Sequence, residues 1–239
     1  DAKEGRDVFT ADIPNAFIQA DLPDPKPGQD RVMMKITGVL AELLAKIAPE
    51  IYAKFVVEEN GQKVLYVVVL KALYGMLVAA LMWYIHIRAD LESIGFKFNN
   101  YDPCVANRIV NGKQQTVRFH VDDLMGSHIQ PEVNSKLIKW LNKKYGGYGE
   151  VKATRGKVHD YLGMTFDFSV PGKVSVGMTD YVASMIEDFS VKLGKSDTAT
   201  TPAADDLMSG STGAVLDKAR AEEFHTMVAR GLFLCKRAR

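Results

Sequence analysis

The pattern of apolar and polar positions predicts a chain of short strands separated by a few longer helices. Branched and aromatic runs predict strands over 7–13, 31–36, 52–58, 63–70, 104–110, 114–121, 124–128, 160–166 and 173–178. A helical period predicts helices over 39–47, 75–94, 131–145, 180–189 and 216–234, with a short helix after Pro14. Loops are expected over 21–30, 152–157 and 190–211. The fold class is therefore α+β.

The order of these elements around 104–128 narrows the fold further. A strand and a helix precede a two-strand hairpin, and a helix and another strand follow it. This is the β-α-β-β-α-β order of the ferredoxin-like split βαβ arrangement. In that arrangement the first strand lies beside the central hairpin, and the C-terminal part of the chain is expected to be mainly helical.

The hairpin carries two adjacent carboxylates, Asp122 and Asp123, at its expected turn. A solvated turn is the default interpretation, because Asp is a common turn residue and Asp205-Asp206 repeats the pair in a loop. Asp12, at the end of the first strand, supplies a third carboxylate. We expect Asp12 and Asp122 to meet, and strand alternation to place Asp123 on the opposite face. Such acids suit two Mg²⁺ or Mn²⁺ ions.

Composition and charge are those of an ordinary globular protein, without an overall basic character. Hydrophobic content is 47%, charged content is 25% and the formal net charge is +1, so any basic surface must be local. The candidates are Lys152, Arg155 and Lys157, and the lysines of the helix over 131–145, for which a solvated face is the simpler interpretation. Two distant cysteines indicate reduced thiols in an intracellular compartment. The longest apolar run, 75–84, is too short for a membrane span. Both ends of the chain look cut from a longer protein.

Six short motifs together carry a resemblance to a known family. They stand at 10–17 (Thr-Ala-Asp-Ile-Pro-Asn-Ala-Phe), 71–75 (Lys-Ala-Leu-Tyr-Gly), 102–104 (Asp-Pro-Cys), 120–123 (His-Val-Asp-Asp), 160–164 (Asp-Tyr-Leu-Gly-Met) and 224–239. In this order and spacing they resemble the reverse transcriptases of copia-type retrotransposons. His120 stands where the family has Tyr. This residue and the sequence of 156–164 resemble the branch found in diatoms and other algae.

The resemblance implies an RNA-directed DNA polymerase working by two-metal-ion nucleotidyl transfer. It implies a polymerase palm with partial fingers over 1–168 and a thumb- or connection-like region over 169–239. The implied roles are catalysis and metal binding for Asp12, Asp122 and Asp123, and nucleotide binding for Phe17 and Gly75. Primer or nucleic-acid binding is implied for His120, Leu162, Gly163, Met164, Lys152, Arg155 and Lys157.

The same resemblance implies partners and a location. The partners are an RNA or DNA template-primer, deoxynucleoside triphosphates, and the rest of a polyprotein that includes a missing N-terminal fingers segment and an RNase H domain. The location is a virus-like particle in the cytoplasm, with no membrane partner.

Other interpretations stay open at this point. The stretch 76–80 lacks the polar pair usual in the family, which favours an inactive retroelement remnant that folds and binds nucleic acid without catalysis. A nucleotidyl cyclase is a further alternative, although the hairpin lacks a glycine-rich signature. Phe17 could be a core aromatic residue, Gly75 a helix cap, Gly163 a bulge glycine, and His120 a half-buried strand residue.

Overall fold

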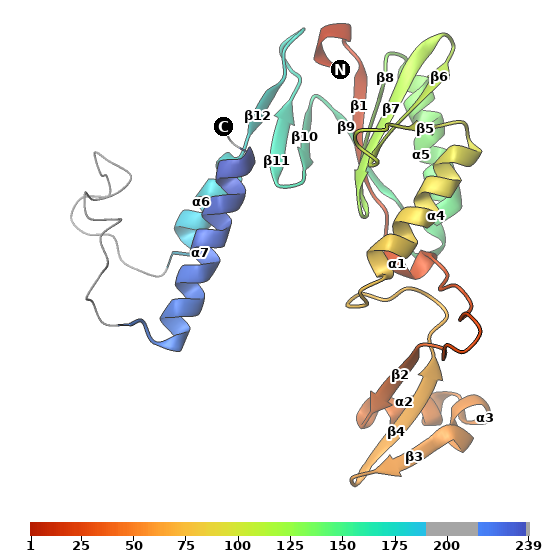
Figure 1. Ribbon diagram of the computed structural model, residues 1–239. Helices are drawn as coiled ribbons and strands as arrows, with labels where there is room; N and C mark the ends of the chain where they lie inside the picture. Colours follow the sequence, from red (N-terminus) through yellow and green to blue (C-terminus); the bar gives the residue numbers. More distant parts are fainter. Residues whose placement is uncertain (190–214, 238–239) are drawn as a thin grey trace. The chain divides into compact units, whose positions relative to one another are not determined.

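The computed structural model describes residues 1–189 and 215–237, and it combines helices with antiparallel sheets (Figure 1). The predicted α+β class is confirmed. The chain divides into two compact units, one formed by Asp1 and 6–155, the other by 2–5 and the chain from Gly156 onward. The expected division into a palm over 1–168 and a connection region over 169–239 stays a prediction.

The first unit is built on a six-stranded sheet in the order β5-β6-β7-β8-β1-β9. Its strands are β1 (Asp7–Asp12), β5 (Lys97–Phe98), β6 (Val105–Val110), β7 (Lys113–His120), β8 (Asp123–His128) and β9 (Lys152–Gly156). The first strand pairs with β8 of the central hairpin, as the predicted arrangement requires. The expected loop over 152–157 is wrong for most of its length, because these residues form the edge strand β9.

Helices α4 (Ala79–Ser93) and α5 (Pro131–Tyr145) cover the sheet (Figure 1). One core cluster joins Trp83 and Ile87 of α4, Leu137 and Leu141 of α5, and inward-facing residues of the strands, with Phe9 fully buried. The apolar spacing of this helix predicts an inward face with Val133, Leu137, Ile138 and Leu141, and the structure confirms it. Because both helices share this cluster, they pack on the same face of the sheet. Residues 75–78 were expected to be helical, but α4 begins only at Ala79.

The excursion between β1 and α4 forms a small separate sheet in the order β2-β4-β3. Helix α1 (Ala16–Gln19) precedes this excursion. The excursion itself consists of β2 (Met33–Thr37), α2 (Val39–Ile47), α3 (Pro49–Tyr52), β3 (Val56–Glu59) and β4 (Gln62–Val68). Residues 52–55, predicted as the start of a strand, are helical. Pro49 begins the short helix α3, and a 3-10 turn over 53–55 follows it. The helical spacing of α2 predicts an apolar stripe of Leu40, Leu43, Leu44 and Ile47. This stripe is largely exposed, and Ala41 is the buried residue of the helix.

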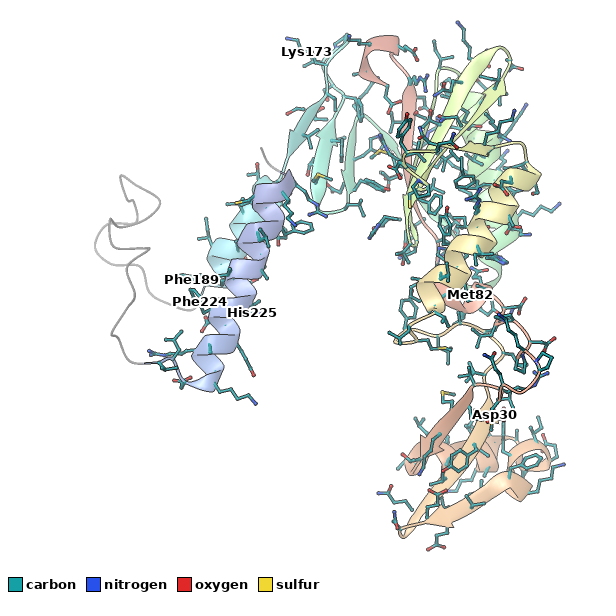
Figure 2. All side chains as sticks on the ribbon, viewed as in Figure 1. Asp30, Met82, Lys173, Phe189, Phe224 and His225 are labelled. Carbon is teal, nitrogen blue, oxygen red and sulfur yellow. The ribbon has the colours of Figure 1, made fainter. Side chains whose placement is uncertain are left out.

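The second unit combines a three-stranded sheet with two helices lying side by side (Figure 1). Its elements are β10 (Val158–Tyr161), β11 (Met164–Asp167), β12 (Ser175–Gly177), α6 (Thr179–Glu187) and α7 (Lys218–Arg237). Figure 2 labels Phe189 just after α6, and Phe224 and His225 on α7. The single strand expected over 160–166 is wrong, because Leu162 and Gly163 turn the chain between β10 and β11. The predicted loop over 190–211 lies outside the described residues.

Gly126 provides a direct test of how tightly the central strands pack. It lies opposite Phe9 in the β1–β8 pairing, and a Cβ added there would come within 2.3 Å of the Phe9 ring. We expect Gly126→Ala to lower the free energy of unfolding by about 1–3 kcal/mol, because overpacking forces the buried ring to move. Urea unfolding followed by circular dichroism measures this change.

Gly147→Ala is the matched control, because a Cβ at Gly147 would meet nothing within 4 Å. Its effect should stay within about 0.5 kcal/mol. Equal stability of the Gly126→Ala and Gly147→Ala variants would contradict the packing described here.

Candidate active site

The Asp122 turn connects β7 to β8 through two residues. His120 pairs with Asp123, so Val121 and Asp122 form the loop of a tight hairpin. Val121 has a φ of 57°, which is rare for a β-branched residue. A backbone strain of this kind costs about 1–3 kcal/mol and persists only where the surroundings enforce it.

Two hydrogen bonds hold the backbone of this turn. The buried indole of Trp83 donates from Nε1 to the Val121 carbonyl at 2.6 Å. The Ile13 amide donates to the Asp122 carbonyl at 3.2 Å. Because Ile13 follows Asp12, the second bond joins the backbone beside one candidate carboxylate to the backbone of another.

The third carboxylate is placed by strand register. Asp12, the last residue of β1, lies directly opposite Asp123, the first residue of β8. Directly opposed residues of antiparallel strands project from the same face. The expectation that Asp123 lies away from the other acids is therefore wrong in its geometry: Asp12 faces Asp123, and Asp122 sits beside them in the turn.

The electrostatics of the cluster follow from this placement. Asp12 is exposed, whereas Asp122 and Asp123 are half-buried. Burial, followed by the charges of Asp122 and Asp12, raises the pKa of Asp123, while His120 acts in the opposite direction. Three carboxylates at one end of the sheet thus create a concentrated negative field that a cation would relieve.

Tyr74 belongs to the same neighbourhood, although its side chain was not assigned a role from the sequence. Partial burial and then the charges of Asp122 and Asp12 raise the pKa of its phenol. Its ring lies 4.5 Å from the ring of Phe17, measured between centroids. Gly75 follows with a φ of 90°, in a left-handed conformation before α4, so it is not the cap of that helix. Phe17, Tyr74 and Gly75 therefore come together near the acids.

The remaining predicted site residues fall into two groups. His120 is exposed at the end of β7, and Lys152 is exposed on β9. The Arg155 guanidinium is engaged within the first unit: it pairs with the Asp7 carboxylate and donates to the Ser135 hydroxyl at 3.0 Å. Lys157 lies between β9 and β10, beyond the end of the large sheet.

Leu162, Gly163 and Met164 belong to the second unit. Leu162 and Gly163 form the tip of the β10–β11 hairpin, with φ values of 53° and 73°, and Met164 starts β11. The bulge interpretation of Gly163 is therefore replaced by a two-residue turn. Asp205-Asp206 lies outside the described residues.

Within residues 1–189 and 215–237, no group of three or more His, Cys, Asp or Glu side chains is arranged to hold a metal ion. The carboxylates are gathered at one end of the sheet but do not enclose an ion by themselves. Among the described helices, none is long and apolar enough to cross a membrane.

Comparison with known proteins identifies the family. A family model described as reverse transcriptase (RNA-dependent DNA polymerase) matches residues 29–205. The chain belongs to this reverse transcriptase family. The matched range includes the Asp122 turn and Tyr74, whereas Asp12 and Phe17 precede it. The prediction of a reverse transcriptase is thereby confirmed.

A transposon Ty5-1 protein of Saccharomyces cerevisiae is similar to part of this reverse transcriptase chain. The two are 25% identical over 123 residues, which is 52% of this chain and 38% of the yeast protein. The chain thus spans well under half the length of this relative. A retrotransposon origin is supported, and the algal or diatom branch stays a prediction.

The burial of Asp123 and the repulsion from Asp122 and Asp12 yield a stability prediction. The folded chain keeps a proton on Asp123 at higher pH than the unfolded chain does, so the stabilisation from this group is lost as pH rises through its folded-state pKa. In metal-free buffer at pH 7, Asp123→Asn should raise the Tm by about 1–3 °C and flatten its dependence on pH. Calorimetry between pH 4 and 8 measures both effects.

Asp30→Asn is the matched control, because Asp30 is an exposed loop aspartate (Figure 2). Its Tm should change by less than about 1 °C. A lower Tm for Asp123→Asn than for the unmodified chain would contradict the unfavourable burial and repulsion of the Asp123 carboxylate.

Proposed function

We propose that this chain is the RNA-directed DNA polymerase core of a retrotransposon, with its reaction centre at Asp12, Asp122 and Asp123. The observation that carries the proposal is the pairing of Asp12 with Asp123 beside a strained turn that presents Asp122. Membership of the reverse transcriptase family supports the reaction class. The palm-like sheet is part of the proposal, since the order β7-β8-β1-β9 brings these acids to one end.

The donor chemistry of this site fits divalent cations. Magnesium is usually held by one or two carboxylates together with waters and substrate phosphates, so a complete cage of protein ligands is not required. Asp12 and Asp122 would be its principal ligands, with Asp123 as the neighbouring acid. When bound, two Mg²⁺ or Mn²⁺ ions would supply Lewis-acid activation of the 3′-hydroxyl and stabilisation of the leaving pyrophosphate.

The protein's own residues position the reacting groups. The Ile13 and Trp83 hydrogen bonds hold the turn, so that Asp122 needs little rearrangement when substrate arrives. Asp12 and Asp123 keep their side chains on one face through strand pairing. Burial and then the charges of Asp122 and Asp12 raise the pKa of Asp123, and a bound cation would offset the repulsion among these carboxylates.

A deoxynucleoside triphosphate is the proposed small substrate. Phe17 lies on α1, directly after the strand that carries Asp12, and its ring contacts Tyr74. We assign Phe17 to the wall that excludes a ribose 2′-hydroxyl. Tyr74 supports that ring, and the backbone at Gly75 can approach the nucleotide closely because no Cβ intervenes.

The proposed macromolecular partner is a template-primer. His120 and Lys152 are exposed in the first unit, and Lys157 with the Leu162–Met164 hairpin would contact the primer strand. A fingers segment and an RNase H domain of a longer polyprotein, within an intracellular particle, complete the proposal.

Asp122→Asn tests the reaction class. In the chain joined to its polyprotein fingers segment, we expect primer extension on poly(rA)/oligo(dT) with Mn²⁺ to fall by at least about 10³-fold, because a charged ligand of the cations is lost. Incorporation of labelled dTTP is the measurement, and Asp30→Asn serves as the control. Equal extension by the Asp122→Asn and Asp30→Asn variants would refute this mechanism. Template-primer binding without extension by any variant, the unmodified chain included, would leave a nucleic-acid-binding protein.

Phe17→Ala tests the assignment of the sugar wall. Removing the ring opens space for the 2′-hydroxyl, so the preference for dTTP over UTP should fall roughly 10-fold or more, equivalent to about 1.4 kcal/mol. Single-nucleotide incorporation kinetics with each substrate give the ratio. Unchanged discrimination together with a lower Tm would identify Phe17 as a packing residue only.

A further inference from the structure

Trp83 is the side chain that connects the interior of the first unit to the candidate active site. It lies on α4, its exposed fraction is 1%, and its indole nitrogen donates to the turn carbonyl of Val121. A buried indole N–H requires an acceptor, and here the acceptor is the backbone immediately before Asp122. A core residue therefore bonds directly to the strained part of the turn.

The consequence for Asp122 follows from peptide geometry. The Val121 carbonyl and the Asp122 amide belong to one planar peptide group. A hydrogen bond that holds this carbonyl therefore also fixes the orientation of the backbone from which the Asp122 side chain projects. The Asp122 carbonyl is held in turn by the Ile13 amide. The backbone on both sides of Asp122 is thus held, by Trp83 of α4 before it and by Ile13, the residue after β1, following it.

The indole is itself held from behind. The Tyr145 ring lies against it at 5.4 Å, edge to face, and the His86 ring lies at 5.8 Å, nearly parallel. The Tyr145 hydroxyl donates to the Asp90 carboxylate at 2.7 Å, and Lys144 and His86 also pair with Asp90. Side chains from α4 and α5 therefore fix the plane of the indole.

We propose that Trp83 is a positioning residue for the nucleotidyl-transfer site: its N–H sets the orientation of Asp122 and reports cation binding there. This inference rests on the proposed function, because it assumes that cations bind at Asp12 and Asp122. The indole touches neither substrate nor cation. Its influence passes through the Val121–Asp122 peptide.

The first test removes the hydrogen bond while keeping an aromatic ring. Free Mn²⁺ is followed by electron paramagnetic resonance as the ion is titrated with this chain, with Asp122→Asn, and with Trp83→Phe. We expect Asp122-dependent binding in the unmodified chain, and a dissociation constant about 10-fold higher in Trp83→Phe. Trp140→Phe, which removes the chain's other tryptophan, should bind Mn²⁺ as the unmodified chain does.

The second test keeps the hydrogen bond and observes it. In Trp140→Phe, Trp83 is the sole tryptophan, so its emission reports on the turn. Saturation with Mg²⁺ should shift the emission maximum, with a midpoint matching a competition titration against Mn²⁺, and Asp122→Asn should abolish the shift. Mg²⁺ is used because Mn²⁺ quenches by proximity alone, without any change at the hydrogen bond.

The outcomes separate this inference from the proposed function. If no cation binding depends on Asp122, the proposed cation site fails and the inference fails with it. If binding depends on Asp122 but is equally tight in folded Trp83→Phe, Trp83 is only structural and the inference alone is overturned. If Trp83→Phe does not fold, the emission of Trp140→Phe decides, and an emission maximum unaffected by saturating Mg²⁺ overturns the inference.

Discussion

The pairing of β1 with β8 is the constraint on which the candidate site depends. Its register places Asp12 opposite Asp123 and continues into the bond from the Ile13 amide to the Asp122 carbonyl. A shift of one residue would turn Phe9 out of the core and move Asp12 to the other face of the sheet. The absence of a Cβ at Gly126 allows the Phe9 ring to lie over β8 and keeps this register. Core packing and acid placement are therefore set by the same strand pair.

Much of this arrangement can be predicted from sequence because it follows periodic patterns. Alternating runs around Asn111-Gly112 and Asp122-Asp123 predict the hairpins, and the apolar spacing of α5 predicts its buried face, Val133 and Leu137 included. The neighbourhood of Asp12 and the hairpin follows from topology alone. The direct pairing of Asp12 with Asp123 cannot be predicted from topology, because the register depends on where each strand ends.

Elements without a periodic signal could not be predicted in the same way. All residues of β9 are exposed, so its sequence resembles a polar loop, and pairing at the sheet edge makes it a strand. The segment before α4 is apolar like a helix, yet Leu77 is fully exposed and Gly75 has a positive φ. Tyr74 lies in the motif at 71–75 and Trp83 in the helix predicted over 75–94, but only the three-dimensional contacts relate them to the acids.

Each of the two units contains one bulky residue with a strained backbone conformation. Among the described residues, positive φ values outside glycine occur at asparagines, which tolerate them, and at Val121 and Leu162, which do not. Each of these two bulky residues lies at the tip of a hairpin that the family resemblance associates with substrate.

The supports of these two tips differ in kind. Val121 is held by a directional hydrogen bond from a buried indole, which fixes an angle as well as a position. At the Leu162 turn, the space beside Gly163 is bounded by the Phe233 ring of α7, which packs at a tilt against the Tyr181 ring of α6. Apolar contact limits approach without fixing orientation. Under the proposed function, this difference suits a turn that orients the Asp122 carboxylate in the first unit and a turn that presents its backbone to a primer strand in the second.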